Sequence, residues 1–249
     1  MKYKLTIGWL YPELMSTYGD RGNIIAIQKR CNWRGIETEI KEIDTESTDQ
    51  NLFSSNLLMM GGAQDTEQEQ VAKDLVKKIS VLKKMIESGI PGLYICGGFQ
   101  YLGHYYKTAD GKKLPQLGIL DMYTETPQRK RLIGNIVIES KLFGQKTILI
   151  GFENHGGRTI LGKNIDPLGK VIKGFGSNDS AKEEGAVYKN SIGTYFHGPI
   201  LPKNPILTDY LISKAIEVKY KKEVTLKPLN DELEQNARKA IAKRLSVAI

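Results

Sequence analysis

One short stretch limits the fold of this chain more than any other. The apolar run Gly92–Ile95 leads directly into Cys96, which is followed by two glycines and an amphipathic segment from Gly98. A buried strand that turns sharply into a helix exposes the residue at the turn, with backbone N–H groups and the positive end of the helix beside it. The stretch predicts an α/β fold with Cys96 as a nucleophile. The nearby N–H groups and the positive end of the helix both favour the thiolate of Cys96. The competing interpretation is a buried structural cysteine, which is the usual role of a cysteine taken alone.

Apolar residues recur in the alternation that is typical of a doubly wound α/β sheet. In the first half we expect strands at residues 3–10, 37–43, 56–60 and 92–95, and helices at 23–33, 67–87 and 98–106. After Gly111, shorter strands near residues 135–140, 147–152 and 186–195 indicate a more antiparallel half. A helix at residues 205–218 and an amphipathic stretch from Asn230 follow. We therefore expect one large domain, residues 1–218, and a basic linker with a C-terminal helix, residues 219–249, as an appendage.

Composition narrows the setting in which the protein works. The chain has 249 residues, two cysteines and a net charge of +8. Few cysteines and no early apolar segment of the secretory type indicate a reduced, cytoplasmic protein, and no apolar run approaches the ~20 residues that span a bilayer. Much of the charge lies on interspersed lysines, four of which fall on the solvent side of the predicted helix 67–87: Lys77, Lys78, Lys83 and Lys84. We expect no nucleic-acid partner, because no zinc-finger spacing or RNA-binding signature is present; attraction to anionic substrates or a membrane surface stays open.

A cysteine nucleophile needs a base, and the chain has three histidines. His104 falls within the predicted helix after Cys96, where a histidine usually packs or caps. His155 lies in a turn before two glycines. His197 ends a predicted strand, at the carboxyl edge where open α/β sheets bind ligands. His197 is therefore the predicted base, which would hold Cys96 as thiolate and later protonate a departing amine.

The tetrahedral intermediate of such a reaction also needs donors for its oxyanion. The predicted strand 56–60 ends in Gly61 and Gly62, which form a backbone-exposing loop. Together with Gly97, the N–H of Gly62 could complete an oxyanion hole. An ordinary turn is the alternative interpretation of two adjacent glycines.

These blocks together resemble the triad-type, class I glutamine amidotransferases, and within them the cobyric acid synthase-like subgroup. The resemblance rests on residues 96–100 (CGGFQ), 61–65 (GGAQD) and 195–198 (YFHG). Three further blocks resemble the glutaminase subunits of lipid II isoglutaminyl synthases: residues 17–23 (TYGDRGN), 151–158 (GFENHGGR) and 197–205 (HGPILPKNP). It runs from about Leu5 to about Leu211, and no motif covers the chain after Lys219. It implies a flavodoxin-like domain with a central, mostly parallel sheet and helices on both faces.

The resemblance also implies a reaction and a partner. Cys96 would attack the side-chain amide of L-glutamine, releasing ammonia and leaving a glutamyl thioester that water hydrolyses. A MurT-like, Mur-ligase-family subunit would use ATP to activate the D-glutamate of the lipid II stem peptide, which the ammonia would amidate. This chain has no P-loop, so ATP is expected on the partner, and neither a cofactor nor a metal is expected here.

Four more residues receive roles from the resemblance. Gly62 and Gly97 match the oxyanion donors, and Gln100 matches a position that helps to place the glutamine substrate. An arginine's planar fork suits the α-carboxylate of glutamine, and Arg131 aligns best with the family's arginine. Arg129 is the fallback, and a solvated basic loop is the competing interpretation.

The chain departs from the broad family at two positions. Pro199 stands where many members carry an acid that orients the histidine, so we hypothesise that the partner supplies this acid and that the isolated chain is a poor glutaminase. Tyr94 stands where glycine is usual. Elsewhere, Cys31 is expected in the core and Asn23 is expected to cap the first helix. The alternatives are a glutaminase partner of a corrinoid synthase and a non-catalytic, glutamine-binding scaffold.

Overall fold

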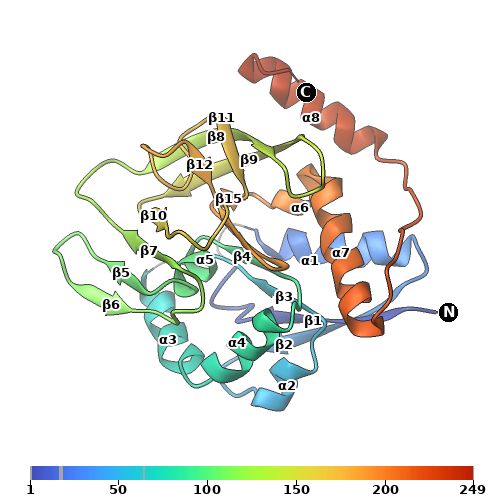
Figure 1. Ribbon diagram of the computed structural model, residues 1–249, viewed down its shortest axis with the longest axis horizontal. Helices are drawn as coiled ribbons and strands as arrows, with labels where there is room; N and C mark the ends of the chain where they lie inside the picture. The colour runs from blue at the N-terminus through green and yellow to red at the C-terminus, as the bar shows by residue number, and fades with distance from the viewer. Residues whose placement is uncertain (1, 17–18, 64, 249) are drawn as a thin grey trace.

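A six-stranded sheet forms the centre of the protein, in a computed structural model that describes residues 2–16, 19–63 and 65–248. Its strand order is β13-β14-β4-β3-β1-β2, of which β4, β3, β1 and β2 are labelled in Figure 1. All neighbouring strands are parallel except β13 and β14. The strands are β1 (Lys4–Leu10), β2 (Glu37–Ile43), β3 (Leu57–Met60), β4 (Gly92–Ile95), β13 (Ala186–Tyr188) and β14 (Ser191–Thr194). Every residue of β3, β4 and β14 is buried, as expected of central strands covered on both faces.

Helices cover both faces of this sheet, which confirms the predicted α/β architecture. Figure 1 shows α1 and α7 on one side and α2, α3 and α4 on the other. The first group is α1 (Arg21–Asn32), with the short α6 (Ile200–Lys203) and α7 (Pro205–Tyr220). The second group is α2 (Asp49–Phe53), α3 (Asp65–Leu75) and α4 (Ile79–Glu87), while α5 (Gly97–Tyr101) follows β4. Apolar residues at helical spacing, such as Ile24, Ile27 and Cys31 of α1, are buried against the sheet. Cys31 is thus a core residue, as expected.

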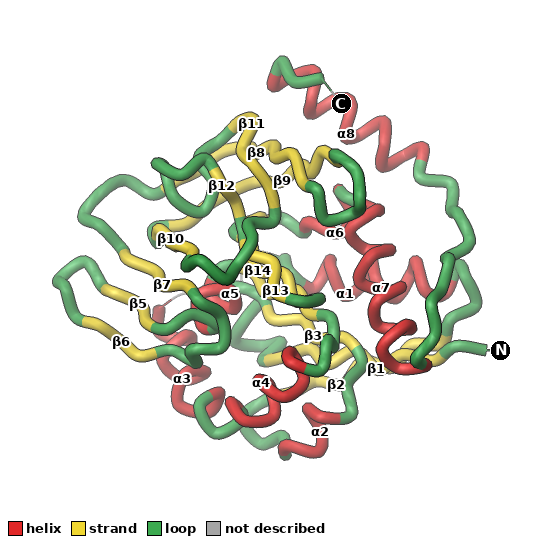
Figure 2. The backbone as a smooth tube through the Cα atoms, in the orientation of Figure 1, coloured by secondary structure: helices red, strands yellow, loops and turns green. Residues whose placement is uncertain are grey.

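The second half of the chain builds two smaller sheets beside the carboxyl ends of the central strands (Figure 2). The four-stranded sheet contains β10 (Arg158–Leu161), β7 (Met122–Glu125), β5 (Tyr105–Lys107) and β6 (Lys113–Pro115). The five-stranded sheet contains β12 (Glu183–Glu184), β11 (Gly169–Lys173), β8 (Leu132–Ser140), β9 (Thr147–His155) and β15 (Phe196–His197). Pairing is antiparallel throughout the five-stranded sheet, as the shorter strand patterns predict.

The C-terminal helix α8 (Glu232–Leu245) packs on the five-stranded sheet of its own chain. Ala242 meets Val137 and Ile150 in a small apolar cluster. Arg238 is buried and donates to the carbonyl oxygen of Ile148 and to Asn204 Oδ1, both at 2.6 Å. In the described part of the chain, no helix is long and apolar enough to cross a membrane.

The linker before α8 is also fastened to the body of the protein. Arg30 of α1 forms ion pairs with Asp209 of α7 and with Asp231 at the end of the linker. Arg34 donates to the carbonyl oxygen of Lys227 over 2.7 Å. Residues 221–231 therefore follow a fixed path along α1 and α7.

Four local predictions are wrong for identifiable reasons. The helix expected over residues 67–87 is broken at 76–78, where Lys78 turns inward and pairs with the buried Asp74 instead of facing solvent. The helix expected over 98–106 ends at Tyr101, because the N–H of His104 donates to the carbonyl oxygen of Met122 and the chain continues as β5.

The strand expected over 186–195 is a hairpin that reverses at Lys189, whose φ is +53°. Asn23 lies inside α1, where its Oδ1 accepts from the N–H of Leu201.

Candidate active site

Cys96 stands at a strained turn between β4 and α5. Its backbone has φ +51° and ψ −106°, a conformation that costs an L-residue free energy and persists only when neighbours enforce it. The N–H of Cys96 donates to the carbonyl oxygen of Thr194 over 2.9 Å, and its own carbonyl oxygen accepts from the N–H of Gln100. A side chain on Gly98 would lie 2.8 Å from the carbonyl oxygen of Met60, so only glycine fits there. The predicted nucleophile elbow is therefore present.

Gly62, Cys96 and His197 meet at one point of the structure. A Cβ on Gly62 would lie 3.1 Å from Cys96 Cβ, 3.7 Å from Cys96 Sγ and 3.5 Å from His197 Cε1. The three residues come from the loop after β3, the end of β4 and the strand β15. The N–H of Gly97 is directed at the cysteine sulfur, where it lowers the pKa of the thiol. The absence of a side chain on Gly62 leaves room beside the sulfur for a reacting group.

His197 reaches this point through β15, which pairs with β9. The antiparallel register places His197 opposite Phe152 and Phe196 opposite Glu153. Burial, together with the nearby charges of Arg131 and Lys203, lowers the pKa of His197 to about 4. The imidazole is therefore neutral at pH 7 and can accept a proton.

The surroundings of Cys96 favour its thiol over the expected thiolate. Burial raises the pKa of its thiol to about 12, and the nearby carboxylate of Asp20 raises it too. The helix that follows has only five residues, so its dipole is too small to offset burial. A neutral thiol beside a neutral imidazole means that proton transfer must accompany nucleophilic attack.

Asp20, for which no catalytic role was expected from the sequence, lies beside the glycine loop. Its Oδ2 accepts the N–H of Gly62 over 3.0 Å, and the side chain is fully buried. Burial raises the pKa of Asp20 to about 6. The residue belongs to the block 17–23 (TYGDRGN) that resembles the glutaminase subunits, of which residues 17 and 18 lie outside the described part of the chain. Gln64 of the glycine loop also lies outside it.

The two candidate arginines differ in position. Arg131 donates from Nε to Asn154 Oδ1 over 3.0 Å and to the carbonyl oxygen of Asn154 over 2.8 Å. Its charge lowers the pKa values of both Cys96 and His197, which places it close to the pair. The side chain of Arg129 is 71% exposed and lies 3.9 Å from Asp179. The structure thus brings Arg131 to the site and leaves Arg129 outside it.

Gln100 lies four residues after Cys96, within the short helix α5. Its Nε2 donates to the hydroxyl of Tyr195 over 3.0 Å, and that hydroxyl is 2.6 Å from Thr159 Oγ1. The amide is therefore held by a chain of hydrogen bonds that reaches β10.

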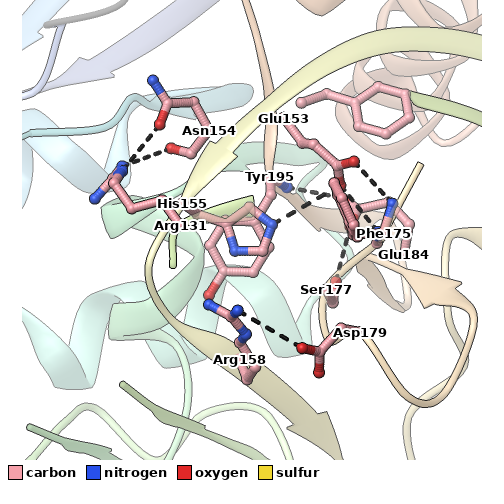
Figure 3. Close-up of polar contacts among 12 residues, drawn as sticks. Arg131, Glu153, Asn154, His155, Arg158, Phe175, Ser177, Asp179, Glu184 and Tyr195 are labelled. Carbon is pink, nitrogen blue, oxygen red and sulfur yellow. Dashed lines mark hydrogen bonds and ion pairs between the residues drawn. The ribbon is translucent and has the colours of Figure 1, made fainter. Parts of the chain in front are cut away.

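The other two histidines have structural roles. His155 stacks on Tyr195 with ring centroids 3.8 Å apart (Figure 3). Its Nδ1 lies 2.7 Å from the carbonyl oxygen of Gly157. Burial lowers the pKa of His155 to about 3, so this ring is a neutral part of the wall behind the site. His104 lies in an exposed turn, 3.4 Å from Asp121.

Two buried carboxylates brace the same wall. Glu153 accepts hydrogen bonds from the N–H groups of Phe175 and Gly176. Glu184 accepts hydrogen bonds from the hydroxyl of Thr194 and the N–H of Tyr195. Figure 3 shows both beside the stacked rings. Among the described residues, no group of three or more histidine, cysteine or acidic side chains could hold a metal ion.

Comparison with known families decides what this site belongs to. Residues 6–205 match the model of the CobB/CobQ-like glutamine amidotransferase domain. The chain belongs to this family. Its fold also resembles those of solved structures. One is a glutamine amidotransferase, with a TM-score of 0.55 over 84% of this chain and 98% of that chain at 17% identity. Another is a glutamine amidotransferase from Thermotoga maritima, with a TM-score of 0.53 over 97% of this chain and 93% of that chain, also at 17% identity.

Curated relatives narrow the assignment within the amidotransferases. The chain is 44% identical to the lipid II isoglutaminyl synthase (glutamine-hydrolyzing) subunit GatD of Staphylococcus aureus, over 97% of this chain and 96% of that protein. It is 39% identical to the GatD subunit of Streptococcus pneumoniae, over 94% and 88%. A probable cobyric acid synthase of Methanosphaera stadtmanae is 35% identical over 59% of this chain, but over only 31% of its own length.

Proposed function

We propose that this amidotransferase is the glutaminase subunit of a lipid II isoglutaminyl synthase. The observation that carries the proposal is the meeting of Cys96, His197 and Gly62 at a strained elbow, in a chain whose GatD relatives match it over nearly their whole length. A scaffold that only bound glutamine would need neither the strained thiol nor the neutral imidazole beside it.

The first half of the reaction releases ammonia. Cys96 Sγ attacks the side-chain carbonyl carbon of L-glutamine while His197 takes the thiol proton, which suits a protonated thiol and an unprotonated ring. The N–H groups of Gly62 and Gly97 stabilise the oxyanion. His197 then returns its proton to the departing nitrogen, leaving a glutamyl thioester and ammonia.

The second half regenerates the enzyme. His197 removes a proton from water, the resulting nucleophile attacks the thioester, and glutamate leaves as the cysteine is restored as a thiol. Arg131 binds the α-carboxylate of glutamine, and Gln100 helps to place the substrate. Pro199 stands where other amidotransferases have an acid, so the group that orients His197 is proposed to come from the partner subunit.

The partner is proposed to be a MurT-like subunit of the Mur-ligase family, which would bind ATP and lipid II in the cytoplasm and amidate D-glutamate of the stem peptide. This chain would then need no cofactor of its own. A corrinoid-forming partner is the alternative, and the short share of the cobyric acid synthase that the chain matches favours the isoglutaminyl synthase.

The test follows nitrogen from donor to product. The chain is purified with a co-expressed Mur-ligase-like subunit and given glutamine labelled with ¹⁵N in its amide, ATP and lipid II. Mass spectrometry should find the label in the stem peptide, and Cys96→Ala should abolish its transfer while leaving amidation by added ammonium intact. Label that reaches a corrinoid carboxylate instead of lipid II would support the alternative.

A further inference from the structure

The backbone N–H of Gly62, which is the proposed oxyanion donor, already donates a hydrogen bond in this structure. It donates to Asp20 Oδ2 over 3.0 Å. The carboxylate lies so close to the glycine loop that a Cβ on Gly61 would stand 2.5 Å from the same oxygen. It also lies close enough to Cys96 to raise the pKa of the thiol. An acidic side chain therefore stands where the negative oxygen of a tetrahedral intermediate would need a donor.

One N–H cannot serve both groups. An oxyanion hole stabilises the transition state because its donors point at the developing charge before the reaction begins. A carboxylate on that donor takes the hydrogen bond and adds a like charge beside the oxyanion, where burial leaves little water to screen it. Glutamine turnover thus requires Asp20 to leave Gly62.

Asp20 is weakly held where it stands. Its Oδ1 is buried and has no hydrogen-bond partner among the described residues, and its Oδ2 accepts the N–H of Gly62. A fully buried carboxylate with so few donors is costly. Asp20 also directly precedes α1, a position at which aspartate commonly accepts the first free N–H groups of the helix, yet here it makes no side-chain cap bond. A second set of donors is therefore within its reach.

We propose that Asp20 is an autoinhibitory group, whose carboxylate blocks the oxyanion donor of the free chain and is drawn away when the partner subunit binds. The proposal rests on the proposed glutaminase function. It gives that function a regulatory step: ammonia is released only when an acceptor subunit is present to use it.

The start of α1 is placed to transmit such a change. A Cβ on Gly22 would lie 2.4 Å from Cγ of Pro199, so the first turn of α1 rests on the segment directly after His197. Asn23 Oδ1 accepts the N–H of Leu201 over 2.9 Å in the same region. A shift of this turn therefore reaches both Asp20 and the loop that carries the base.

Two substitutions separate the effect of the hydrogen bond to the N–H of Gly62 from the effect of the negative charge of Asp20. Asp20→Ala removes both the carboxylate and the acceptor, whereas Asp20→Asn removes the charge but keeps an oxygen that can accept the N–H of Gly62. Asp121→Asn is the matched control, because Asp121 is a partly exposed acid beside His104 and outside the site. Each variant is compared with the wild type as the free chain and as the complex with the co-expressed Mur-ligase-like subunit.

The expected gain is confined to the free chain. Asp20→Ala should raise its kcat/KM for glutamine hydrolysis at least about tenfold, a part of the 10²–10³-fold that one oxyanion donor contributes, and should change the complex less than about threefold. Asp20→Asn should give a smaller gain. Alkylation of Cys96 by iodoacetamide, which needs the thiolate but no oxyanion donor, should accelerate in both Asp20 variants and not in Asp121→Asn.

Several results would overturn the proposal. Equal losses of activity in the free chain and the complex would show that Asp20 supports the glycine loop instead of blocking it. Equal gains in both would exclude release by the partner, and so would a wild-type free chain as active as the complex. A wild-type complex without any glutaminase activity would instead refute the proposed function. Alkylation rates that do not change in the Asp20 variants would contradict the position of Asp20 beside the cysteine sulfur.

Discussion

The backbone N–H of Cys96 donates to the carbonyl oxygen of Thr194, three residues before His197. This bond continues the parallel pairing of β4 and β14 by one residue beyond the last residue of β4. The nucleophile and the base therefore leave neighbouring strands at the same edge of the sheet. Their meeting follows from strand register, and the loops only complete it.

The strained backbone at Cys96 should affect the free energy of unfolding. A left-handed φ costs an L-residue about 1–3 kcal/mol and costs glycine little. We expect Cys96→Gly to be more stable than Cys96→Ala, the reverse of the usual order, because alanine keeps the strain at φ +51°. Urea unfolding of the two variants measures the difference. An alanine variant that is the more stable by about 1 kcal/mol, as in ordinary chain segments, would contradict a strained elbow.

Arginine substitutions distinguish the two candidates for the α-carboxylate. Arg131→Ala should raise KM for glutamine, by at least about tenfold for the loss of a charged hydrogen bond. Arg129→Ala should leave KM within about twofold, because Arg129 is exposed at Asp179. Steady-state kinetics of the complex test both. A larger effect at Arg129 would reverse the assignment.

The burial of Asp20 predicts a pH-dependent stability. Its folded pKa is about 6, above the ordinary value of 3.8, so the stability linked to its proton is present below pH 3.8 and is lost as the pH rises through 6. The ionised group then lowers the free energy of unfolding by on the order of 2–3 kcal/mol. Asp20→Asn should be the more stable protein at pH 7.5 and lose most of that advantage at pH 4.5.

Urea unfolding at the two pH values tests this, with Asp121→Asn as the control. A difference between Asp20→Asn and the wild type that stays constant with pH would show that Asp20 is not held as a buried carboxylate.

The C-terminal helix should depend on one buried arginine. Arg238 donates to Asn204 Oδ1 and to the carbonyl oxygens of Ile148 and Lys203. Arg238→Ala would remove these three hydrogen bonds, and should lower the free energy of unfolding by about 1–3 kcal/mol. Leu233 on the same helix is 79% exposed, so Leu233→Ala should stay within about 0.5 kcal/mol. Equal effects of the two substitutions would mean that Arg238 does not anchor α8.

The parts of the fold that local pattern decides were predictable. Strands at residues 37–43 and 92–95 coincide with the predicted ones, since apolar spacing and the bounding glycines carry the signal. The elbow at Cys96 was equally readable, because strand, cysteine and paired glycines adjoin in the chain. His197 could be placed at the carboxyl edge of the sheet from the strand that precedes it.

The rest depends on contacts between distant positions. Lys78 looked like a solvated residue until Asp74, itself bonded to Tyr11, drew it inward. Residues 105–107 form a strand because β6 and β7 lie beside them. Asp20 meets Gly62 only in the folded chain, so no local spacing could reveal the blocked donor. The burial that raises the pKa of Cys96 is likewise not visible in the sequence, which shows only the short helix beside it.

Glutamine hydrolysis by the complex with the Mur-ligase-like subunit tests the central claim most directly. The wild type, Cys96→Ala and Cys31→Ala are compared, with glutamate release as the readout. Cys31 is the matched control, because it is a fully buried core thiol whose pKa is raised to about 12. We predict hydrolysis by the wild type and by Cys31→Ala, and none by Cys96→Ala. Hydrolysis that survives the loss of Cys96, or a wild-type complex that releases no glutamate, would contradict the account.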